Sequence, residues 1–109
     1  MATWLVIPAF NEDAVLGSTL SSAMDRFGRN IVVVDDKSTD YTRLRAIEAG
    51  VHVCSHPINL GQGAALQTGI DYALSQGADC IVTFDADGQH RPEDAAAMVE
   101  EFKRSGVDI

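Results

Sequence analysis

The chain has 109 residues, of which 46% are hydrophobic and 22% are charged, so we expect one modest globular domain with a small core. Eight Lys and Arg residues against 16 Asp and Glu residues give a formal net charge of −8, and the basic residues are scattered. This balance disfavours binding to nucleic acids or anionic membranes through a basic patch. An acidic protein can still bind a polyphosphate if a metal ion supplies the positive charge.

Cysteine usage and hydropathy indicate a cytoplasmic protein. Cys54 and Cys80 lie in apolar, strand-like stretches without zinc-ligand spacing, so we expect two buried free thiols rather than a disulfide. The apolar run at the N-terminus has no basic region and is interrupted by Pro8, which argues against a secretory signal. No apolar window approaches the length of a membrane span.

Strands and helices are predicted to alternate along the first half of the chain. The apolar run Thr3 to Ile7 predicts a strand, and apolar residues at helical spacing then predict a helix that stops at Gly28. Four β-branched residues, 31–34, predict the second strand. A second helix, capped by Ser38, Thr39 or Asp40, is expected to run to about Ala49, with Leu44 and Ile47 facing inward.

The second half continues this alternation. A short strand is predicted at Val51 to Cys54, a helix from the Gly61-x-Gly63 pair to Gly77, and a buried strand at Cys80 to Phe84. A last helix is expected from Pro92 to just before Gly106, with Phe102 in its buried stripe, and a further strand starts at Val107. The pattern predicts an α/β fold, a doubly wound and mostly parallel sheet with helices on both faces.

Acidic residues follow the strand that ends at Phe84. Asp85 and Asp87 would project to the same side in extended geometry, and Gly88 permits a turn that brings in Gln89. Oxygen ligands of this kind suit Mg²⁺ or Mn²⁺, which would bridge to a diphosphate. On this motif alone, a solvated acidic turn is an equally good interpretation.

Other strand ends also carry polar residues. Of Asp35 and Asp36, we expect one to be structural and the other to accept hydrogen bonds from a ribose hydroxyl or a base, although a response-regulator-like acidic pocket is an alternative. Glu12 either lies in this site or only complements the dipole of the following helix. The Gly61-x-Gly63 helix start favours an anion, or is a plain turn. His52 and His56 are expected to be structural or on the surface.

Taken together, these loops resemble family 2 glycosyltransferases of the GT-A fold. The resemblance covers essentially all 109 residues and is closest to polyprenyl-phosphate or dolichyl-phosphate sugar synthases. It rests on four ordered motifs: Pro8-Ala9-Phe10-Asn11-Glu12, Val34-Asp35-Asp36-Lys37-Ser38-Thr39-Asp40, Asn59-Leu60-Gly61-Gln62-Gly63-Ala64-Ala65 and Asp85-Ala86-Asp87-Gly88-Gln89-His90. One departure is Lys37, where the family commonly has Gly, so a positive φ there would be strained.

The resemblance implies roles for individual residues. The implied nucleotide contacts are Pro8, Phe10, Asn11 (which supports its loop), Glu12, Val34, Asp36, Gly63, Ala64, Asp85 and Ala86. The implied metal ligands for Mg²⁺ or Mn²⁺ are Asp85, Asp87 and Gln89, and the same two aspartates are the implied catalytic residues.

The resemblance also implies an activity, inverting transfer of a sugar from a UDP- or GDP-sugar to a polyprenyl phosphate, a dolichyl phosphate or a glycan. Residues 1–109 would be a single, truncated nucleotide-sugar-binding domain, inactive alone, whose full-length parent lies in the cytoplasm or at the cytoplasmic face of a membrane. The alternative is a non-catalytic nucleotide-binding or self-associating module, a homodimer formed through an exposed sheet edge. The sequence does not distinguish uridine from guanosine donors.

Overall fold

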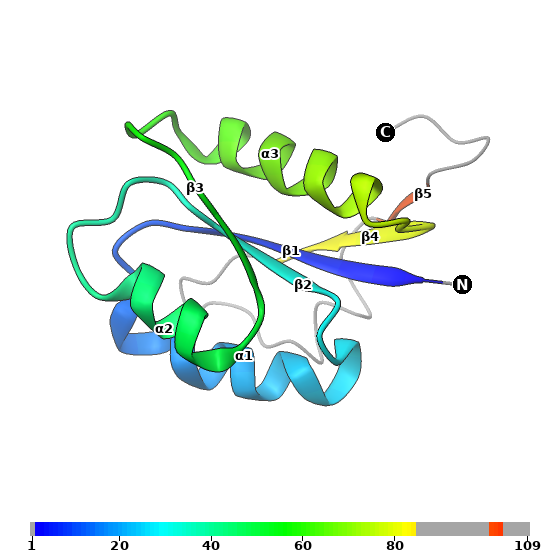
Figure 1. Ribbon diagram of the computed structural model, residues 1–109, viewed down its shortest axis with the longest axis horizontal. Coiled ribbons are helices and arrows are strands. Elements are labelled where there is room, and N and C mark those ends of the chain that lie inside the picture. The colour runs from blue at the N-terminus through cyan, green and yellow to red at the C-terminus, as the bar shows by residue number, and fades with distance from the viewer. Residues whose placement is uncertain (1, 85–100, 104–109) are drawn as a thin grey trace.

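The computed structural model describes residues 2–84 and 101–103 (Figure 1). Within these ranges the strands form one sheet in the order β3-β2-β1-β4-β5. The strands are β1 (Thr3–Ala9), β2 (Ile31–Asp35), β3 (His52–Ser55), β4 (Cys80–Thr83) and β5 (Glu101–Lys103). The helices are α1 (Asp13–Phe27), α2 (Thr42–Ala49) and α3 (Gln62–Ser75).

The sheet is mostly parallel and has helices on both faces, which confirms the predicted fold class. β1 is central and pairs in parallel with β2 and β4, while β3 pairs in parallel with β2. In Figure 1, α1 and α2 lie on one side of the sheet and α3 lies on the other. Because the helices cover both faces, the central strands are apolar on both sides, as their continuous apolar runs predict.

Two clusters of buried side chains form the core, one on each face of the sheet. Alternation along β1 sends Leu5 and Ile7 into the cluster that contains residues of α1, and Trp4 and Val6 into the cluster that contains residues of α3. Figure 1 shows the corresponding helices on opposite sides. All three described helices therefore pack on the short strands. The carboxyl ends of the parallel strands lie at one edge of the sheet.

The first strand extends past its predicted end at Ile7. Pro8 lies within β1 and pairs with Val34, although proline cannot donate a backbone hydrogen bond. Proline is tolerated at this position because the pairing of β1 with β4 ends at Val6 and Thr83. Pro8 lies beyond that last pair, so β4 requires no hydrogen bond from it. This extension carries Pro8 and Ala9 to the carboxyl edge of the sheet.

The helix expected from Pro92 to just before Gly106 is wrong at residues 101–103. These residues form β5, which pairs antiparallel with β4. The ladder satisfies the open backbone groups of β4, and such tertiary pairing overrides a local helical pattern. The rest of that predicted helix, and the strand expected from Val107, lie outside the described residues.

The predicted inward face of α2 is also wrong. Leu44 and Ile47 are 46% and 47% exposed, and the buried residues of α2 are Thr42 and Ala46. The hydroxyl Oγ1 of Thr42 accepts a hydrogen bond of 2.7 Å from the backbone N–H of Glu12. This polar contact fixes which face of α2 is buried. The helix has only eight residues, too few for the spacing of its apolar residues to determine that face.

The cysteines are free, as predicted. Cys80 is buried and Cys54 is half-buried, so the expected burial holds fully only for Cys80. Burial raises the pKa of the Cys54 thiol, which keeps it protonated at neutral pH. None of the helices in the described ranges is both long and apolar enough to cross a membrane.

Gly69 allows α3 to approach the sheet closely. A Cβ atom there would overlap Cγ1 of Val6 and lie 3.1 Å from Cγ2 of Val34. We expect Gly69→Ala to lower the free energy of unfolding by about 1–3 kcal/mol, because both neighbours belong to buried strands. Urea unfolding measures this change.

Gly17→Ala is the matched control for that experiment. Gly17 lies inside α1, and nothing stands within 4 Å of the position its Cβ would take. Alanine there should raise the free energy of unfolding by about 0.5–1 kcal/mol through helix propensity alone. Equal effects at the two glycines would contradict the close packing of α3 on β1 and β2.

Candidate functional site

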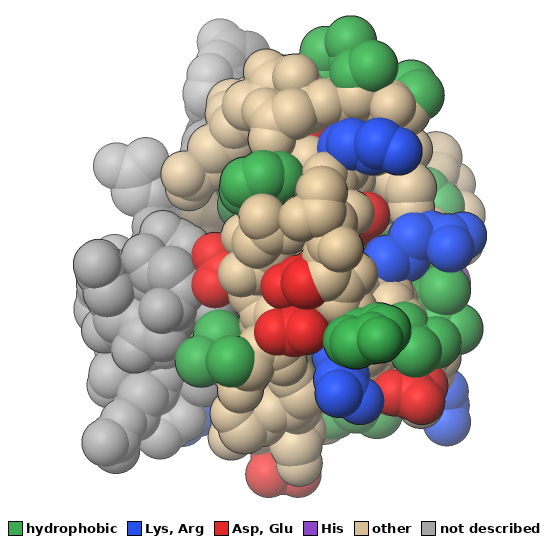
Figure 2. Space-filling view, turned by 90° about the vertical axis from the view of Figure 1, so that its left-hand side faces the viewer, with side chains coloured by type: hydrophobic (Ala, Val, Ile, Leu, Met, Phe, Trp, Pro, Cys, Tyr) green, Lys and Arg blue, Asp and Glu red, His purple; other side chains and the backbone are tan. Residues whose placement is uncertain are grey.

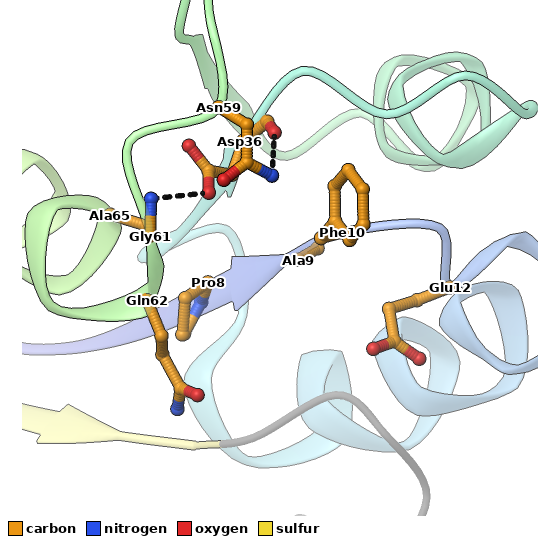
Figure 3. A pocket seen from close by; sticks show the side chains of 9 residues that line it. All are labelled: Pro8, Ala9, Phe10, Glu12, Asp36, Asn59, Gly61, Gln62 and Ala65. Atoms are coloured by element: carbon orange, nitrogen blue, oxygen red, sulfur yellow. Dashed lines mark hydrogen bonds between the residues drawn. The ribbon is translucent and has the colours of Figure 1, made fainter.

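A pocket of about 380 Å³ lies at the carboxyl edge of the sheet. Its volume is within the range of small-molecule sites. Figure 2 shows this side of the molecule, where Asp and Glu side chains gather near the middle of the face. The close view in Figure 3 shows the nine lining residues: Pro8, Ala9, Phe10, Glu12, Asp36, Asn59, Gly61, Gln62 and Ala65.

Asp36 joins the walls of this pocket. Its Oδ1 accepts hydrogen bonds from Nδ1 of His56 (2.8 Å) and from the backbone N–H of Leu60 (2.9 Å). Its Oδ2 accepts from the backbone N–H of Gly61 (2.9 Å), and its backbone oxygen accepts from Nδ2 of Asn59 (3.2 Å). One residue at the end of β2 therefore holds the whole loop that leads into α3.

His56 extends this network behind the pocket. It is buried, and its Nε2 is hydrogen bonded to Oγ1 of Thr68 on α3 (2.8 Å). An ionised carboxylate only accepts hydrogen bonds, so Nδ1 of His56 is the donor to Asp36. His56 is therefore structural, as predicted, and it connects Asp36 to α3.

The environment of Asp36 keeps its side chain ionised. Burial by itself would raise the pKa of Asp36, but hydrogen bonds from Leu60, His56 and Gly61 outweigh burial and leave the pKa below its ordinary value. This wall of the pocket therefore carries a negative charge at neutral pH.

A second network joins the loop after β1 to the loop after β2. Oδ1 of Asn11 accepts from the backbone N–H of Thr39 (2.8 Å), and the backbone N–H of Asn11 donates to Oγ of Ser38 (2.9 Å). Asp40 accepts from the backbone N–H of Thr42 (2.9 Å), the first residue of α2. The N-cap position itself is Tyr41, so the cap predicted at Ser38, Thr39 or Asp40 is wrong by at least one residue. The network fixes the loop that carries Phe10 and Glu12.

Asp40 also has a low pKa for a physical reason. Burial would raise the pKa of Asp40, but hydrogen bonds from the side chain and backbone of Thr42 and from the backbone of Asp13 hold it below its ordinary value. Two ionised carboxylates, Asp36 and Asp40, thus stabilise the loops around the pocket.

The structure brings together some of the residues predicted for nucleotide binding. Pro8, Phe10, Glu12 and Asp36 line the pocket, and Asn11 supports its loop from outside it. Val34, Gly63 and Ala64 do not line the pocket, and Val34 is fully buried in the core. Asp85, Ala86, Asp87 and Gln89 lie outside the described residues.

Five lining residues were not among the predicted nucleotide contacts: Ala9, Asn59, Gly61, Gln62 and Ala65. All five belong to the motifs that carry the family resemblance, so the signal was present. The helix α3 begins at Gln62, which turns Gly61, Gln62 and Ala65 toward the pocket instead of Gly63 and Ala64.

The described part of the chain contains no cluster of three or more His, Cys, Asp or Glu residues that could hold a metal ion. The predicted ligands follow Phe84, whose backbone N–H donates to the oxygen of Val6 (3.0 Å). β4 therefore runs toward the same edge of the sheet as β1, the edge where the pocket lies.

The fold and the site identify a class of protein, the α/β domains that bind a ligand at the carboxyl ends of their parallel strands. Nucleotides are common ligands of this class. Comparison with known proteins identifies the family. The family model for glycosyl transferase family 2 matches residues 4–109, and the chain belongs to this family. The resemblance to dolichyl-phosphate and polyprenyl-phosphate sugar transferases is also confirmed.

Two relatives show how far this similarity extends. The chain is 46% identical to an uncharacterized protein of Methanocaldococcus jannaschii, over 97% of this chain and 44% of the relative. It is 34% identical to the UDP-N-acetylglucosamine–dolichyl-phosphate N-acetylglucosaminyltransferase of Methanococcus voltae, over 89% of this chain and 45% of the relative. The chain thus spans a little under half the length of these relatives.

A solved structure shares the fold. Glucosyl-3-phosphoglycerate synthase from Mycobacterium tuberculosis matches with a TM-score of 0.68 and 30% identity, over 84% of this chain and 36% of that enzyme. Crystal structures of that enzyme hold UDP with Mg²⁺, and UDP-glucose with Mn²⁺.

We expect Asp36→Asn to lower the free energy of unfolding by roughly 2–3 kcal/mol near neutral pH, because the single oxygen of a neutral amide cannot replace a charged carboxylate that accepts from three donors. The folded pKa of Asp36 lies below its ordinary 3.8. Its stabilising contribution is therefore complete above that value and is lost as pH falls through the folded pKa. The difference in stability between wild type and variant should shrink on acidification.

Urea unfolding at several pH values from about 7 to about 2.5 tests this pH dependence. Asp71→Asn is the control, because Asp71 is exposed and accepts a single hydrogen bond from Gln67. The control should change little at any pH. A stability difference for Asp36→Asn that is constant across the range would contradict the assigned role of its charge.

The turn after Asp36 contains a strained residue. Lys37 has a φ of 64°, which confirms the concern that this position, commonly Gly in the family, requires a left-handed backbone. We expect Lys37→Gly to be more stable than Lys37→Ala by about 1 kcal/mol, because only glycine lacks the Cβ that is strained there. Thermal or urea unfolding of both variants measures the difference, and equal stabilities would show that the turn relaxes without glycine.

Proposed function

We propose that this chain binds the nucleotide of a nucleotide diphosphate-sugar and serves a glycosyltransferase that passes the sugar to a polyprenyl or dolichyl phosphate. The single observation that carries the proposal is the pocket walled by Phe10, Glu12 and Asp36 at the carboxyl edge of a family 2 fold. Residues 1–109 would act as one donor-binding domain.

The lining residues suit a nucleoside. Phe10 is 44% exposed, and its ring is available to stack on a base, while Pro8 and Ala9 add an apolar floor. Glu12 and Asp36 provide carboxylate oxygens for base and ribose groups that donate hydrogen bonds. Val34, Gly63 and Ala64 would act from behind this surface, by shaping the strand end and the start of α3.

The diphosphate needs a positive charge that the pocket lining does not supply. The nine lining residues include two acids and no Lys or Arg. We propose that Asp85, Asp87 and Gln89 hold Mg²⁺ or Mn²⁺, with Asp85 and Ala86 next to the ribose. Oxygen ligands fit these cations, and the bound ion would neutralise the diphosphate as a leaving group.

The reaction would be an inverting displacement at the anomeric carbon. A phosphate oxygen of the acceptor forms the new bond to that carbon as the bond to the nucleotide diphosphate breaks. A lipid phosphate is already anionic, so no strong general base is required. The relative from Methanococcus voltae, whose name specifies a dolichyl phosphate, supports this acceptor class.

Acceptor binding is not evident in the described residues, so we propose that this stretch of chain supplies donor binding and does not turn over alone. A lipid acceptor would place the full reaction at a membrane, and we propose its cytoplasmic face. Self-association through an open edge of β4 has no support, because β5 covers that edge.

Isothermal titration of UDP and of GDP, each with Mn²⁺ and with EDTA, tests the donor site. We expect one nucleotide to bind with Mn²⁺, and its affinity to fall at least roughly tenfold in EDTA or in Asp87→Ala, because the diphosphate charge is then unopposed.

Asp25→Ala is the control for loss of an acidic residue, since Asp25 is exposed on α1 and does not line the pocket. It should bind the nucleotide as the wild type does. Affinity that is unaffected by EDTA would contradict the metal site, and absence of binding by a folded chain would contradict donor binding by this chain.

A further inference from the structure

We infer that the outer face of α2 docks on a lipid bilayer that carries negatively charged headgroups. This surface, called the α2 face below, consists of exposed apolar side chains and the arginines that border them: Tyr41, Leu44, Ile47, Arg29, Arg43 and Arg45. The choice of a lipid as the occupant rests on the proposed function, in which the acceptor is a lipid phosphate.

The apolar part of the α2 face is a continuous stripe. Tyr41, at the N-cap, is 63% exposed, and Leu44 and Ile47 on the helix are 46% and 47% exposed. Each of these residues is three positions from the next, so their side chains are neighbours on the helix surface. The buried residues Thr42 and Ala46 lie on the opposite side of α2. An exposed apolar stripe bordered by charged residues is typical of a surface that contacts a partner.

Three arginines make the α2 face basic. Arg43 and Arg45 are exposed on α2, and Arg29 reaches the end of this helix, where its Nη1 donates to the backbone oxygen of Gly50 (3.0 Å). The only acid within α2 is Glu48, which pairs with Arg45 (3.4 Å). Such an exposed ion pair is weak, so Arg45 can turn to another anion. The fold thus collects three positive charges against one negative charge.

The net charge of −8 does not prevent contact with an anionic bilayer. Charges in water are screened over about 8 Å at physiological ionic strength. The molecule is 23 Å across its shortest axis, so most of its acidic groups lie beyond that distance from the α2 face. Figure 2 shows basic and hydrophobic side chains next to each other in the right-hand part of the view. A bilayer at the α2 face therefore responds mainly to the local positive charge.

An anionic bilayer offers partners for both parts of the α2 face. A helix of this kind lies in the plane of the membrane surface, with apolar side chains below the headgroups and basic side chains at their level. The guanidinium groups of the arginines match lipid phosphates, and the aliphatic parts of these side chains lie along the apolar region. Tyr41 suits the boundary because its ring is apolar and its hydroxyl is polar.

Docking through α2 would hold the pocket beside the bilayer. The backbone N–H of Tyr41 donates to Oδ2 of Asp13, at the start of α1 (3.2 Å). Oγ1 of Thr42 accepts from the backbone N–H of Glu12 (2.7 Å), and Glu12 lines the pocket. The start of α2 is therefore joined to one wall of the pocket. A donor in the pocket would lie near the headgroups, where the phosphate of a lipid acceptor is found.

Co-sedimentation with lipid vesicles tests the inference on the whole chain, without nucleotide or metal. One set of vesicles contains phosphatidylcholine alone, and the other contains phosphatidylcholine with an equal part of phosphatidylglycerol, which is anionic. We expect the chain to bind the anionic vesicles, and to bind phosphatidylcholine alone at least roughly tenfold more weakly. Added salt should weaken the binding to anionic vesicles, because it screens the arginines.

Two double variants separate the apolar part from the basic part. Leu44→Gln with Ile47→Gln removes the apolar stripe, and Arg43→Gln with Arg45→Gln removes two charges. Each pair should weaken binding to anionic vesicles at least roughly tenfold. All four side chains are exposed, so thermal unfolding should show that both variants fold.

Each double variant has a matched control. Arg43→Lys with Arg45→Lys keeps the charge and should retain binding. Ile58→Gln removes another exposed apolar side chain, which is 61% exposed and lies in the loop that leads to α3, the helix on the other side of the sheet (Figure 1). It should bind the vesicles as the wild type does.

Three results would overturn the inference. The first is a folded chain that does not bind anionic vesicles, and the second is equal binding by the wild type and both double variants. The third is a concentration-dependent dimer in sedimentation that Leu44→Gln with Ile47→Gln abolishes, with no vesicle binding, which would make the α2 face an interface between copies of this chain. Nucleotide titration without vesicles measures donor binding separately, so failure at the α2 face and failure of the donor site are distinguishable.

Discussion

The buried carboxylate of Asp36 is the interaction on which the pocket depends. It sits at the end of β2 and bonds to the end of β3 through His56 and to the loop before α3 through Leu60 and Gly61. A buried charge is unfavourable without such donors, and the backbone N–H groups of that loop would equally lack partners without the charge. The loop and the carboxylate therefore stabilise each other, and Gly61, with a φ of 98°, gives the loop the conformation that this bonding requires.

The opposite wall of the pocket is fixed by the same kind of chemistry. Phe10 and Glu12 belong to a surface loop, and such loops are usually mobile. Here Asn11 bonds to Ser38 and Thr39, and the backbone of Glu12 bonds to Thr42. The loop after β1 is thus tied to the loop after β2, which also carries Asp36. Because both walls are held before a ligand arrives, less ordering is left for the binding step.

The sequence predicted what depends on local pattern. Runs of β-branched residues located β1, β2 and β4, and the acidic residues at strand ends located the edge where the pocket lies. The predictions failed where contacts between residues far apart in the sequence determine the structure. Leu44 and Ile47 are exposed because Thr42 forms a hydrogen bond to Glu12, which sets the buried face of α2. Residues 101–103 form a strand because β4 offers an open edge for pairing. The sequence also could not tell that Asp36 is both structural and part of the pocket, since its hydrogen-bond partners are 20 to 25 residues away along the chain.

The two ends of the proposed ligand respond differently to the negative charge of this protein. In the proposed function, the base end would meet a fixed acceptor, Asp36, whose charge is held by the fold. The diphosphate end approaches a protein with a net charge of −8 and a pocket lined by Glu12 and Asp36. Free nucleotide is repelled by that field, whereas a nucleotide already bound to a divalent cation carries less negative charge and is repelled less. The metal would therefore favour the approach of the donor as well as its binding, and the complex of metal and nucleotide is the form expected to enter the pocket.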